Sequence, residues 1–303
     1  MREQTLDRLI RIGLEVVAAG IVLAAGIYFL DRPNTTPTLV DRQIAAGEKA
    51  VRQNPTNVGL RLQLAEVYRT ANRQASALEQ YSAVLKAEQN QTALLGRGEI
   101  LSQQGELSGA RKSFEEVIGK AGTAEFSAVN PKLESAHYGL AAVLLKQHQA
   151  TAAVGEAKKA LKIEPTDADA WYLLGTAAYG AGSYDQAVKA LRQAVIFVPS
   201  GWCQPYEQLA KSYEAQQHKP QAEYAVAMVE LCEKKPAAAT QRLERLTSGP
   251  VAVDAMLGLG MAAEAQSQRA SATHWYRQVL AVDPGNFNAR GGLTRLGAHT
   301  GGT

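Results

Sequence analysis

Residues 168–201 read ADAWYLLGTAAYGAGSYDQAVKALRQAVIFVPSG, and this stretch decides the fold. Four of its residues have counterparts 34 positions earlier in the chain. The matching pairs are Leu140 and Leu174, Ala141 and Gly175, Ala153 and Ala187, and Pro165 and Pro199. A period of this length indicates one supersecondary unit that is stacked several times. Such a stack buries a continuous core and presents an extended surface that is suited to binding.

The small and large residues of this unit have separate physical roles. Gly175 and Ala187 are expected where two helices cross, because small side chains let the backbones approach closely. Trp171 and Leu174 are expected to fill the gaps between neighbouring units. Pro199 ends the second helix, since proline cannot donate a backbone hydrogen bond to the preceding turn.

The spacings W-x2-L-G, G-x-Y-x2-A and A-x4-P resemble the tetratricopeptide repeat, a helix–turn–helix unit of 34 residues. The residues that carry this resemblance are Trp171, Leu174, Gly175, Gly182, Tyr184, Ala187, Ala194 and Pro199. The resemblance implies an all-α fold in which helical hairpins stack into a right-handed superhelix, called an α-solenoid. It also implies a function in binding other proteins.

The same register covers nearly everything after residue 57 and predicts a solenoid over residues 58–298 with six repeats. The expected repeats are 58–90, 91–122, 134–167, 168–201, 203–235 and 253–286. A half repeat at 39–57 and a short basic helix at 287–298 are expected to cap the two ends, because terminal repeats need a polar outer face.

Two intervals between repeats exceed one period. The first excess falls at 120–133, where glycine, asparagine and proline indicate a longer connection. The second holds an extra amphipathic helix at 236–247, which is bounded by Pro236 and by the sequence Ser-Gly-Pro at 248–250. Whether this helix pairs with the one before it or lies across the stack stays open at this point.

The N-terminus has a different pattern. Residues 12–30 form an apolar run in which Glu15 is the only charged residue. As a helix this run would be about 28 Å long, close to the hydrocarbon thickness of a bilayer. We therefore expect a single-pass transmembrane helix at 12–30, after an N-terminal segment at 1–11 and before a linker at 31–38. A cleaved signal peptide is the alternative, but no small-x-small cleavage site precedes a polar mature start.

Basic residues near the apolar run predict its orientation. Arg2, Arg8 and Arg11 precede it, whereas only Arg32 and Arg42 follow closely. Because the side richer in lysine and arginine stays in the cytosol, we expect a cytosolic N-terminus. The repeats would then lie in the periplasm or outside the cell, attached to a bacterial-type inner membrane.

The chain has two cysteines, Cys203 and Cys232. They fall at the two ends of the fifth hairpin that antiparallel packing brings side by side. A disulfide between them is therefore geometrically possible, and it would need an oxidising compartment. The alternative is two small buried thiols.

The composition and motifs point away from catalysis and from nucleic acid. The net charge is +3, with 32 basic and 29 acidic side chains, which is too balanced for a nucleic-acid footprint. Gly258, Gly260 and Ala263 match a dinucleotide-binding motif, but they lie in an expected repeat helix and do not follow a strand. No histidine has metal-ligand spacing. We therefore expect no enzyme activity, no catalytic residue, no metal and no cofactor.

The resemblance implies a groove on the inner face of the solenoid, formed by the first helix of each repeat. The groove residues that we expect to bind a protein or peptide are Tyr138, Lys146, Asp169, Tyr172, Thr176, Tyr179, Glu207 and Lys211. Tyrosine suits such a surface because it offers a large contact area and one hydrogen-bonding tip. The alternative is that the tyrosines pack between helices as ordinary core residues.

Two functional hypotheses follow. The first is a membrane-anchored interaction scaffold that recruits or holds a partner protein during assembly, export or maturation of an envelope complex. The second is a permanent accessory subunit of a larger membrane complex. In that case Gly20 and Ala24 would let the membrane helix pack closely against other spans.

Overall fold

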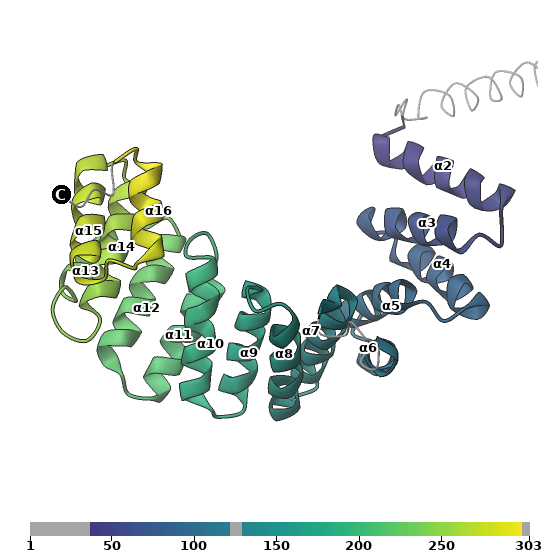
Figure 1. Ribbon diagram of the computed structural model, residues 1–303, viewed down its shortest axis with the longest axis horizontal. Helices are drawn as coiled ribbons and strands as arrows, with labels where there is room; N and C mark the ends of the chain where they lie inside the picture. The colour runs from purple at the N-terminus through teal and green to yellow at the C-terminus, as the bar shows by residue number, and fades with distance from the viewer. Residues whose placement is uncertain (1–36, 122–128, 299–303) are drawn as a thin grey trace, which may run out of the picture. The chain divides into compact units, whose positions relative to one another are not determined.

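The computed structural model describes residues 37–121 and 129–298 (Figure 1). Within these two ranges the chain forms fifteen α-helices and no β-strand, which confirms the all-α prediction. The helices are α2 (Leu39–Gln53), α3 (Val58–Thr70), α4 (Gln74–Ala87), α5 (Gln91–Gln103), α6 (Leu107–Ala121), α7 (Pro131–Lys146), α8 (Ala150–Ile163), α9 (Ala168–Gly180), α10 (Tyr184–Phe197), α11 (Gln204–Ala215), α12 (Lys219–Cys232), α13 (Pro236–Glu244), α14 (Ala252–Ala265), α15 (Arg269–Val282) and α16 (Phe287–Arg295).

The predicted transmembrane helix at 12–30 lies outside the described residues, as do the segment at 1–11 and most of the linker at 31–38. Across the helices that the structure does describe, none combines the length and apolar character that crossing a bilayer requires.

The chain separates into two compact units, Met1–Arg73 and Gln74–Thr303. In the first unit, α2 packs against α3. Thr38 and Asp41 form a capping box that closes the N-terminus of α2. A Cβ added at Gly47 would lie 3.0 Å from a methyl of Leu64, so glycine allows the close crossing of these two helices.

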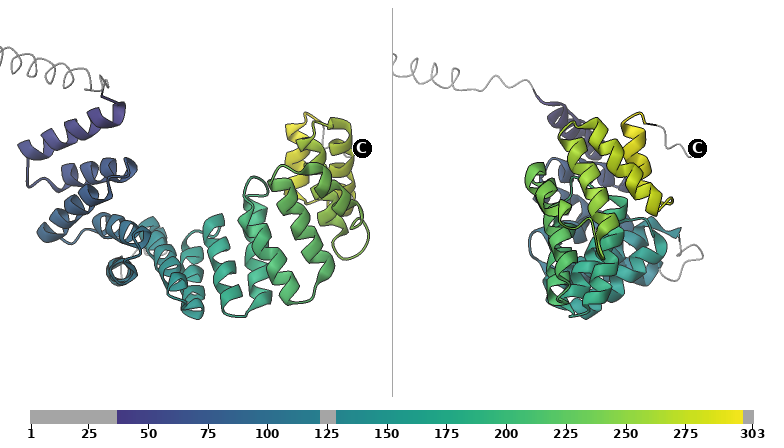
Figure 2. Two further views of the ribbon diagram at one scale, coloured as in Figure 1. Left: turned by 180° about the vertical axis from the view of Figure 1, so that it is seen from behind. Right: turned by 90° about the vertical axis from the view of Figure 1, so that its left-hand side faces the viewer.

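In the second unit, each helix from α4 to α16 packs against the next one in the chain (Figures 1 and 2). Contacts between next-but-one helices join α5 to α7, α7 to α9, and α9 to α11. In a curved stack such contacts form on the inner side, where the helices are closest. The first helices of the repeats therefore line the inner side of this part of the unit, as the family resemblance implies.

A shared turn closes the hairpins within the repeats. In the fourth repeat, Gly182 has a φ of 73°, and its N–H donates to the carbonyl of Tyr179 at 2.9 Å. The N–H of Ser183 then donates to the carbonyl of Ala178, also at 2.9 Å. These two bonds satisfy carbonyls that the helix end would leave unpaired. The corresponding left-handed residues of the other hairpins in this unit are Gly105, His148, Gln217 and Ser267.

The extra helix predicted at 236–247 is α13, and its pairing is now defined. The turn between α12 and α13 repeats the hairpin geometry: Lys234 has a φ of 62°, and the N–H of Lys235 donates to the carbonyl of Glu230 at 2.9 Å. Helix α13 then packs on both α12 and α14. It therefore forms a hairpin with the helix before it and stays within the stack.

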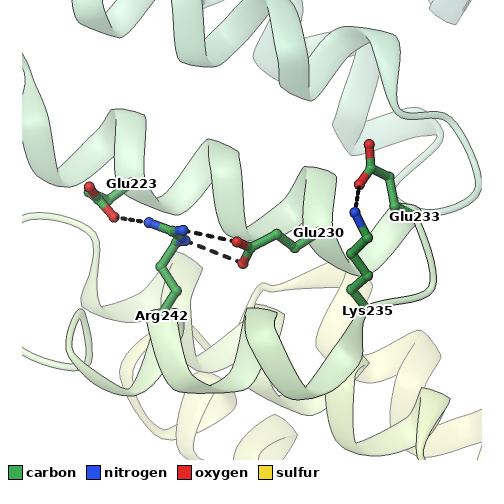
Figure 3. A network of polar contacts seen from close by, with 5 residues as sticks. All are labelled: Glu223, Glu230, Glu233, Lys235 and Arg242. Carbon is green, nitrogen blue, oxygen red and sulfur yellow. Dashed lines mark hydrogen bonds and ion pairs between the residues drawn. The ribbon is translucent and has the colours of Figure 1, made fainter.

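Ion pairs attach α13 to α12 (Figure 3). The guanidinium of Arg242 donates to both carboxylate oxygens of Glu230, at 2.9 and 3.2 Å, and to Glu223 at 2.5 Å. The hydrogen bonds to Glu230 and Glu223 raise the pKa of Arg242 above its already high value. A planar guanidinium suits this two-carboxylate contact because its donors have a fixed fork geometry.

The insertion of α13 changes which helices line the inner side. Beyond α12, the next-but-one contacts join α12 to α14 and α14 to α16. Helix α12, the second helix of its own repeat, thus takes the position that first helices occupy earlier in the unit. Consecutive helices alternate between the inner and the outer side of the stack. One added helix therefore exchanges the odd-numbered helices on the inner side for even-numbered ones.

Two glycines of α14 explain the apparent dinucleotide motif. A Cβ added at Gly258 would lie 3.0 Å from Leu243 of α13, and one at Gly260 would lie 2.5 Å from the Tyr276 ring of α15. Residues two apart project from nearly opposite faces of a helix. The two glycines of the motif are therefore explained by two close helix crossings, one with α13 and one with α15.

The connection expected at 120–133 ends earlier than the spacing suggests. Helix α7 begins at Pro131, because the side chain of Asn130 caps it and proline at the first helical position needs no hydrogen-bond donor. Leu133, in the first turn, is buried. The third repeat therefore starts before residue 134.

Cys203 and Cys232 form a disulfide with a Cα–Cα separation of 5.6 Å. Cys203 directly precedes α11 and Cys232 is the last residue of α12. The bridge therefore ties the open end of the fifth hairpin, opposite the turn that joins its two helices.

Gly175→Leu should destabilise the solenoid by about 2 kcal/mol, because overpacking a close crossing forces neighbouring side chains out of their rotamers. A Cβ at Gly175 would lie 2.5 Å from Cγ of Leu191. Gly155→Leu is the matched control, since nothing lies within 4 Å of a Cβ added there. Thermal unfolding followed by circular dichroism should show a lower midpoint for the first variant alone. Equal midpoints would contradict this account of the crossing.

Replacing both Cys203 and Cys232 by serine should lower the unfolding free energy by about 3 kcal/mol, because the bridge closes a loop with a sequence separation of 29. A reductant should lower the midpoint of the unmodified chain to that of the double variant. The same reductant should leave the double variant unchanged; a shift there would assign the effect to something other than this bridge.

Candidate partner-binding site

A recess opens on the inner side of α5, α7 and α9, with a volume of about 410 Å³. We call it the acidic hollow. Its lining residues are Glu99, Ser102, Gln103, Phe114, Glu134, Ser135, Tyr138, Gly139, Ala142, Asp167 and Asp169. Four of these are carboxylates and none is lysine, arginine or histidine. The hollow therefore presents concentrated negative charge between three successive repeats.

Helix N-termini hold three of the four carboxylates. Glu134 lies in the first turn of α7 and Asp169 in the first turn of α9. Asp167 caps α9 by accepting from the backbone N–H groups of Asp169 and Ala170 at 2.9 and 3.2 Å. The positive end of the helix dipole stabilises negative charge at these positions.

An aromatic ring forms the floor of the hollow. Phe114, from α6, is 2% exposed and reaches between α5 and α7. A Cβ added at Gly139 would lie 2.5 Å from its ring, and one at Gly98 would lie 2.8 Å from it. Glycine at these two positions therefore makes room for the ring, and the ring separates the hollow from the core below.

The carboxylates raise the pKa values of their neighbours. Burial raises the pKa of Glu134, and the nearby Asp167 raises it further. Burial also raises the pKa of the Tyr138 hydroxyl, with Asp169, Asp167 and Glu134 adding to the effect. These shifts show that the negative charges repel one another within the folded unit.

The carboxylates do not converge on a single point. Within residues 37–121 and 129–298, no group of three or more histidine, cysteine or acidic residues is placed to hold a metal ion.

The predicted groove residues lie in three places. Tyr138 and Asp169 line the hollow itself. Lys146 is next to it, and its ammonium donates to the backbone carbonyl and hydroxyl of Ser102 at 2.9 and 3.2 Å. Thr176 donates its hydroxyl to the carbonyl of Tyr172 within α9, at 3.0 Å. Glu207 and Lys211 are exposed on α11 and lie outside the hollow.

The three predicted tyrosines are all partly buried. Tyr138 packs against a core cluster that includes Leu174. The ring of Tyr172 contacts Trp202 edge-on, with 5.1 Å between centroids, and that of Tyr179 lies 5.5 Å from Tyr184. Each ring thus helps to pack neighbouring helices and keeps part of its surface open.

Several lining residues were not among those predicted. Glu99, Ser102 and Gln103 occupy the ninth, twelfth and thirteenth positions of the second repeat, so applying the groove register to that repeat would have found them. Glu134 and Asp167 lie at helix starts, and no groove position in the register corresponds to them.

The fold and this recess define an α-solenoid of helical hairpins with a charged inner surface. Models of the tetratricopeptide repeat match residues 62–125 and 144–200. These two parts of the chain belong to the tetratricopeptide repeat family. No curated protein matches the chain significantly in sequence.

Solved structures share this fold at low identity. YrrB, a TPR protein with an unusual peptide-binding site, is 18% identical with a TM-score of 0.52, over 66% of this chain and 98% of that one. MamA is 22% identical with a TM-score of 0.51, over 60% of this chain and 94% of MamA. The C-terminal part of a TPR repeat-containing protein from Cytophaga hutchinsonii is 17% identical with a TM-score of 0.51. The match covers 84% of this chain and 94% of that one.

Glu134→Gln should raise the unfolding midpoint at neutral pH by about 1 °C, since partly exposed charges contribute only a few tenths of a kcal/mol. The pKa of Glu134 is raised in the folded state. Its contribution therefore favours folding at low pH and is lost as the pH rises through that raised value. The gain should disappear below about pH 4, where this carboxyl is protonated in both states.

Thermal melts of the unmodified chain and of the Glu134→Gln variant from pH 3 to 8 would measure this difference in unfolding midpoint. Glu79→Gln, at an exposed position on α4, is the control for removing one negative charge. A midpoint that falls at neutral pH on changing Glu134 would show that this carboxylate is favourably paired, contrary to the account above.

Proposed function

We propose that this chain is a membrane-anchored interaction scaffold that recruits or holds a partner protein. The partner would lie along the inner side of α5, α7, α9 and α11. The acidic hollow is the observation that carries this proposal, because it is recessed, lies on the inner side and concentrates negative charge.

The charge of the hollow selects the kind of partner segment. A lysine or arginine side chain would offset the negative charge of Glu134, Asp167 and Asp169, and could donate hydrogen bonds to their carboxylates. Tyr138 adds a partly exposed ring that favours a cation near its face. The same charge opposes phosphate groups, in keeping with a polypeptide as partner and not a nucleic acid. The peptide-binding site of YrrB, on a similar fold, also supports a peptide as ligand.

The membrane and compartment parts of the proposal depend on other features. The apolar run at 12–30 supports a single-pass anchor, and the basic residues before it support a cytosolic N-terminus. The disulfide between Cys203 and Cys232 supports an oxidising compartment for the repeats, such as a periplasm. The role that we propose for the scaffold is in the assembly, export or maturation of an envelope complex.

A fluorescein-labelled peptide that alternates arginine and glycine should bind the full chain, and its affinity should fall as salt increases. The double variant Glu134→Gln/Asp169→Asn should weaken binding about tenfold, since two charge-assisted contacts are lost. Fluorescence anisotropy would measure both effects.

The control is Glu79→Gln/Glu244→Gln, which removes the same charge from exposed positions on α4 and α13. It should change the affinity less than twofold. Equal weakening in both double variants would indicate general attraction to a negative surface and would contradict a site at the hollow. A glutamine-for-arginine version of the peptide should bind neither protein.

A further inference from the structure

A recess of about 560 Å³ opens between α8 and α10, the second helices of the third and fourth repeats. We call it the basic recess. Its lining includes Lys158, Lys162 and Lys189, with Asp185 as the one carboxylate among the lining residues. It shares no lining residue with the acidic hollow and has the opposite charge.

The way the hairpins stack leaves this recess open. Helices α7 and α9 touch on the inner side, whereas no contact of that extent joins α8 to α10, both of which the structure describes in full. Helix α9 packs against each of them and supplies Trp171 and Leu174 between them. Together with Leu161 of α8 and Ala190 of α10, these residues form an apolar floor that continues a core cluster.

A fixed aromatic ring forms part of this floor. The indole N–H of Trp171 donates to the carbonyl of Pro165 at 2.7 Å. The ring is partly buried and packs against the core cluster that contains Leu161 and Leu174. Because its one polar atom is already bonded, the part of the ring that stays open is apolar. A rigid tryptophan of this kind is typical of the residues that dominate protein interfaces.

The lysines of the recess lack a counter-ion. Lys158, Lys162 and Lys189 are exposed, and none forms an ion pair with a residue that the structure describes. By contrast, the neighbouring Lys159 pairs with Glu156 at 2.7 Å. Lys158 and Lys162 are also four residues apart on one helix, where like charges oppose each other. A negatively charged ligand would offset this repulsion.

The amide of Gln186, which also lines the recess, lacks a hydrogen-bond partner. Its Nε2 atom is buried, and no residue that the structure describes accepts from it. Among the described residues only Oε1 of Gln147 is a second side-chain atom in this condition. The terminal torsion of glutamine is broad, so a turn of the amide directs its N–H into the recess. A buried donor without an acceptor is costly, and a ligand with an acceptor would remove this cost.

These features select the kind of occupant. Carboxylates complement the lysines and can accept a hydrogen bond from Gln186, while an apolar side chain can cover the floor. The rim of the recess is exposed, so an occupant would keep part of its surface in water. A free small ligand needs most of its surface buried, whereas an apolar centre with a charged rim is typical of contacts between proteins.

We propose that the basic recess binds a second partner, through a polypeptide segment that carries carboxylates beside an apolar side chain. The apolar side chain lies on Trp171 and Leu174, and the carboxylates pair with the three lysines. The site goes beyond the function proposed above and does not depend on the acidic hollow. With both sites, the chain holds a basic segment on the inner side of the third and fourth repeats and an acidic segment on their outer side.

The tryptophans provide a direct test. There are three, Trp171, Trp202 and Trp275, and only Trp171 lines the recess. In the full chain labelled with 5-fluorotryptophan and kept in an uncharged detergent, the probe acetyl-Glu-Asp-Leu-Asp-Glu-amide should shift the ¹⁹F NMR signal of Trp171 alone. Binding of the probe without a shift of Trp171 would place it elsewhere and overturn the proposal.

Three further probes decide the chemistry. Acetyl-Gln-Asn-Leu-Asn-Gln-amide should bind at least tenfold more weakly, because it has no charge to meet the lysines. Acetyl-Glu-Asp-Gly-Asp-Glu-amide should bind at least fivefold more weakly, because nothing covers the apolar floor. If octanoate binds as tightly as the first peptide, the site takes a free amphiphilic anion and the polypeptide proposal is wrong.

Lys158→Gln/Lys189→Gln should weaken the first peptide about tenfold, since two charge-assisted contacts are lost. The matched control is Lys86→Gln/Lys112→Gln, which removes the same charge from exposed positions on α4 and α6. The control should change the affinity less than twofold. Equal weakening in the two double variants would indicate general attraction to a positive surface and would contradict a site at the recess.

Gln186→Leu should weaken the peptide about fivefold, since it removes one hydrogen-bond donor. It should not lower the thermal unfolding midpoint of the free chain, because the donor has no partner there. A lower midpoint would mean that the folded chain already satisfies this amide, which would remove the need for an acceptor from a ligand. Glu134→Gln/Asp169→Asn should bind this peptide normally, which separates a failure here from a failure of the acidic hollow.

Discussion

The close crossing of paired helices at small residues is the constraint on which the rest of the structure depends. At each crossing, a large side chain of one helix fills the space beside a glycine of the other helix. Any larger residue in place of that glycine would put its Cβ into the same space. Leu191 lies against Gly175, Phe114 against Gly139, and Tyr276 against Gly260. These contacts set the distance between helices, and stacking them in sequence produces the continuous core and the curvature of the second unit.

The inner side of this stack combines stabilising and destabilising charges. Capping makes Asp167 favourable for α9, yet its position beside Glu134 raises the pKa of that carboxyl. Residues that oppose stability are typical of binding sites, where a partner supplies the missing opposite charge. The raised pKa of Glu134 in the acidic hollow is therefore in keeping with the binding site proposed above.

One added helix gives the two ends of the second unit inner sides of different composition. Up to α11 the first helices face inward, and α7, α9 and α11 each carry an acidic residue in the first turn. On either side of α13, helices α12, α14 and α16 are joined by next-but-one contacts, and the cavities there combine aromatic and apolar side chains with charged ones such as Arg192 and Asp254. Arg242 holds the added helix in place through Glu223 and Glu230. A change in helix number thus alters the chemistry of the surface without changing the type of fold.

The sequence by itself determined the repeat, the family, and the existence of α13, because period and residue size depend only on local spacing. It also identified Tyr138 and Asp169 as inner-side residues. Only the tertiary structure decided that α13 pairs with α12, that four carboxylates from successive repeats line one hollow, and that Tyr224 of α12 lines a cavity. These depend on side chains far apart in the chain, whose distances follow from how the helices stack and not from the spacing within any one repeat.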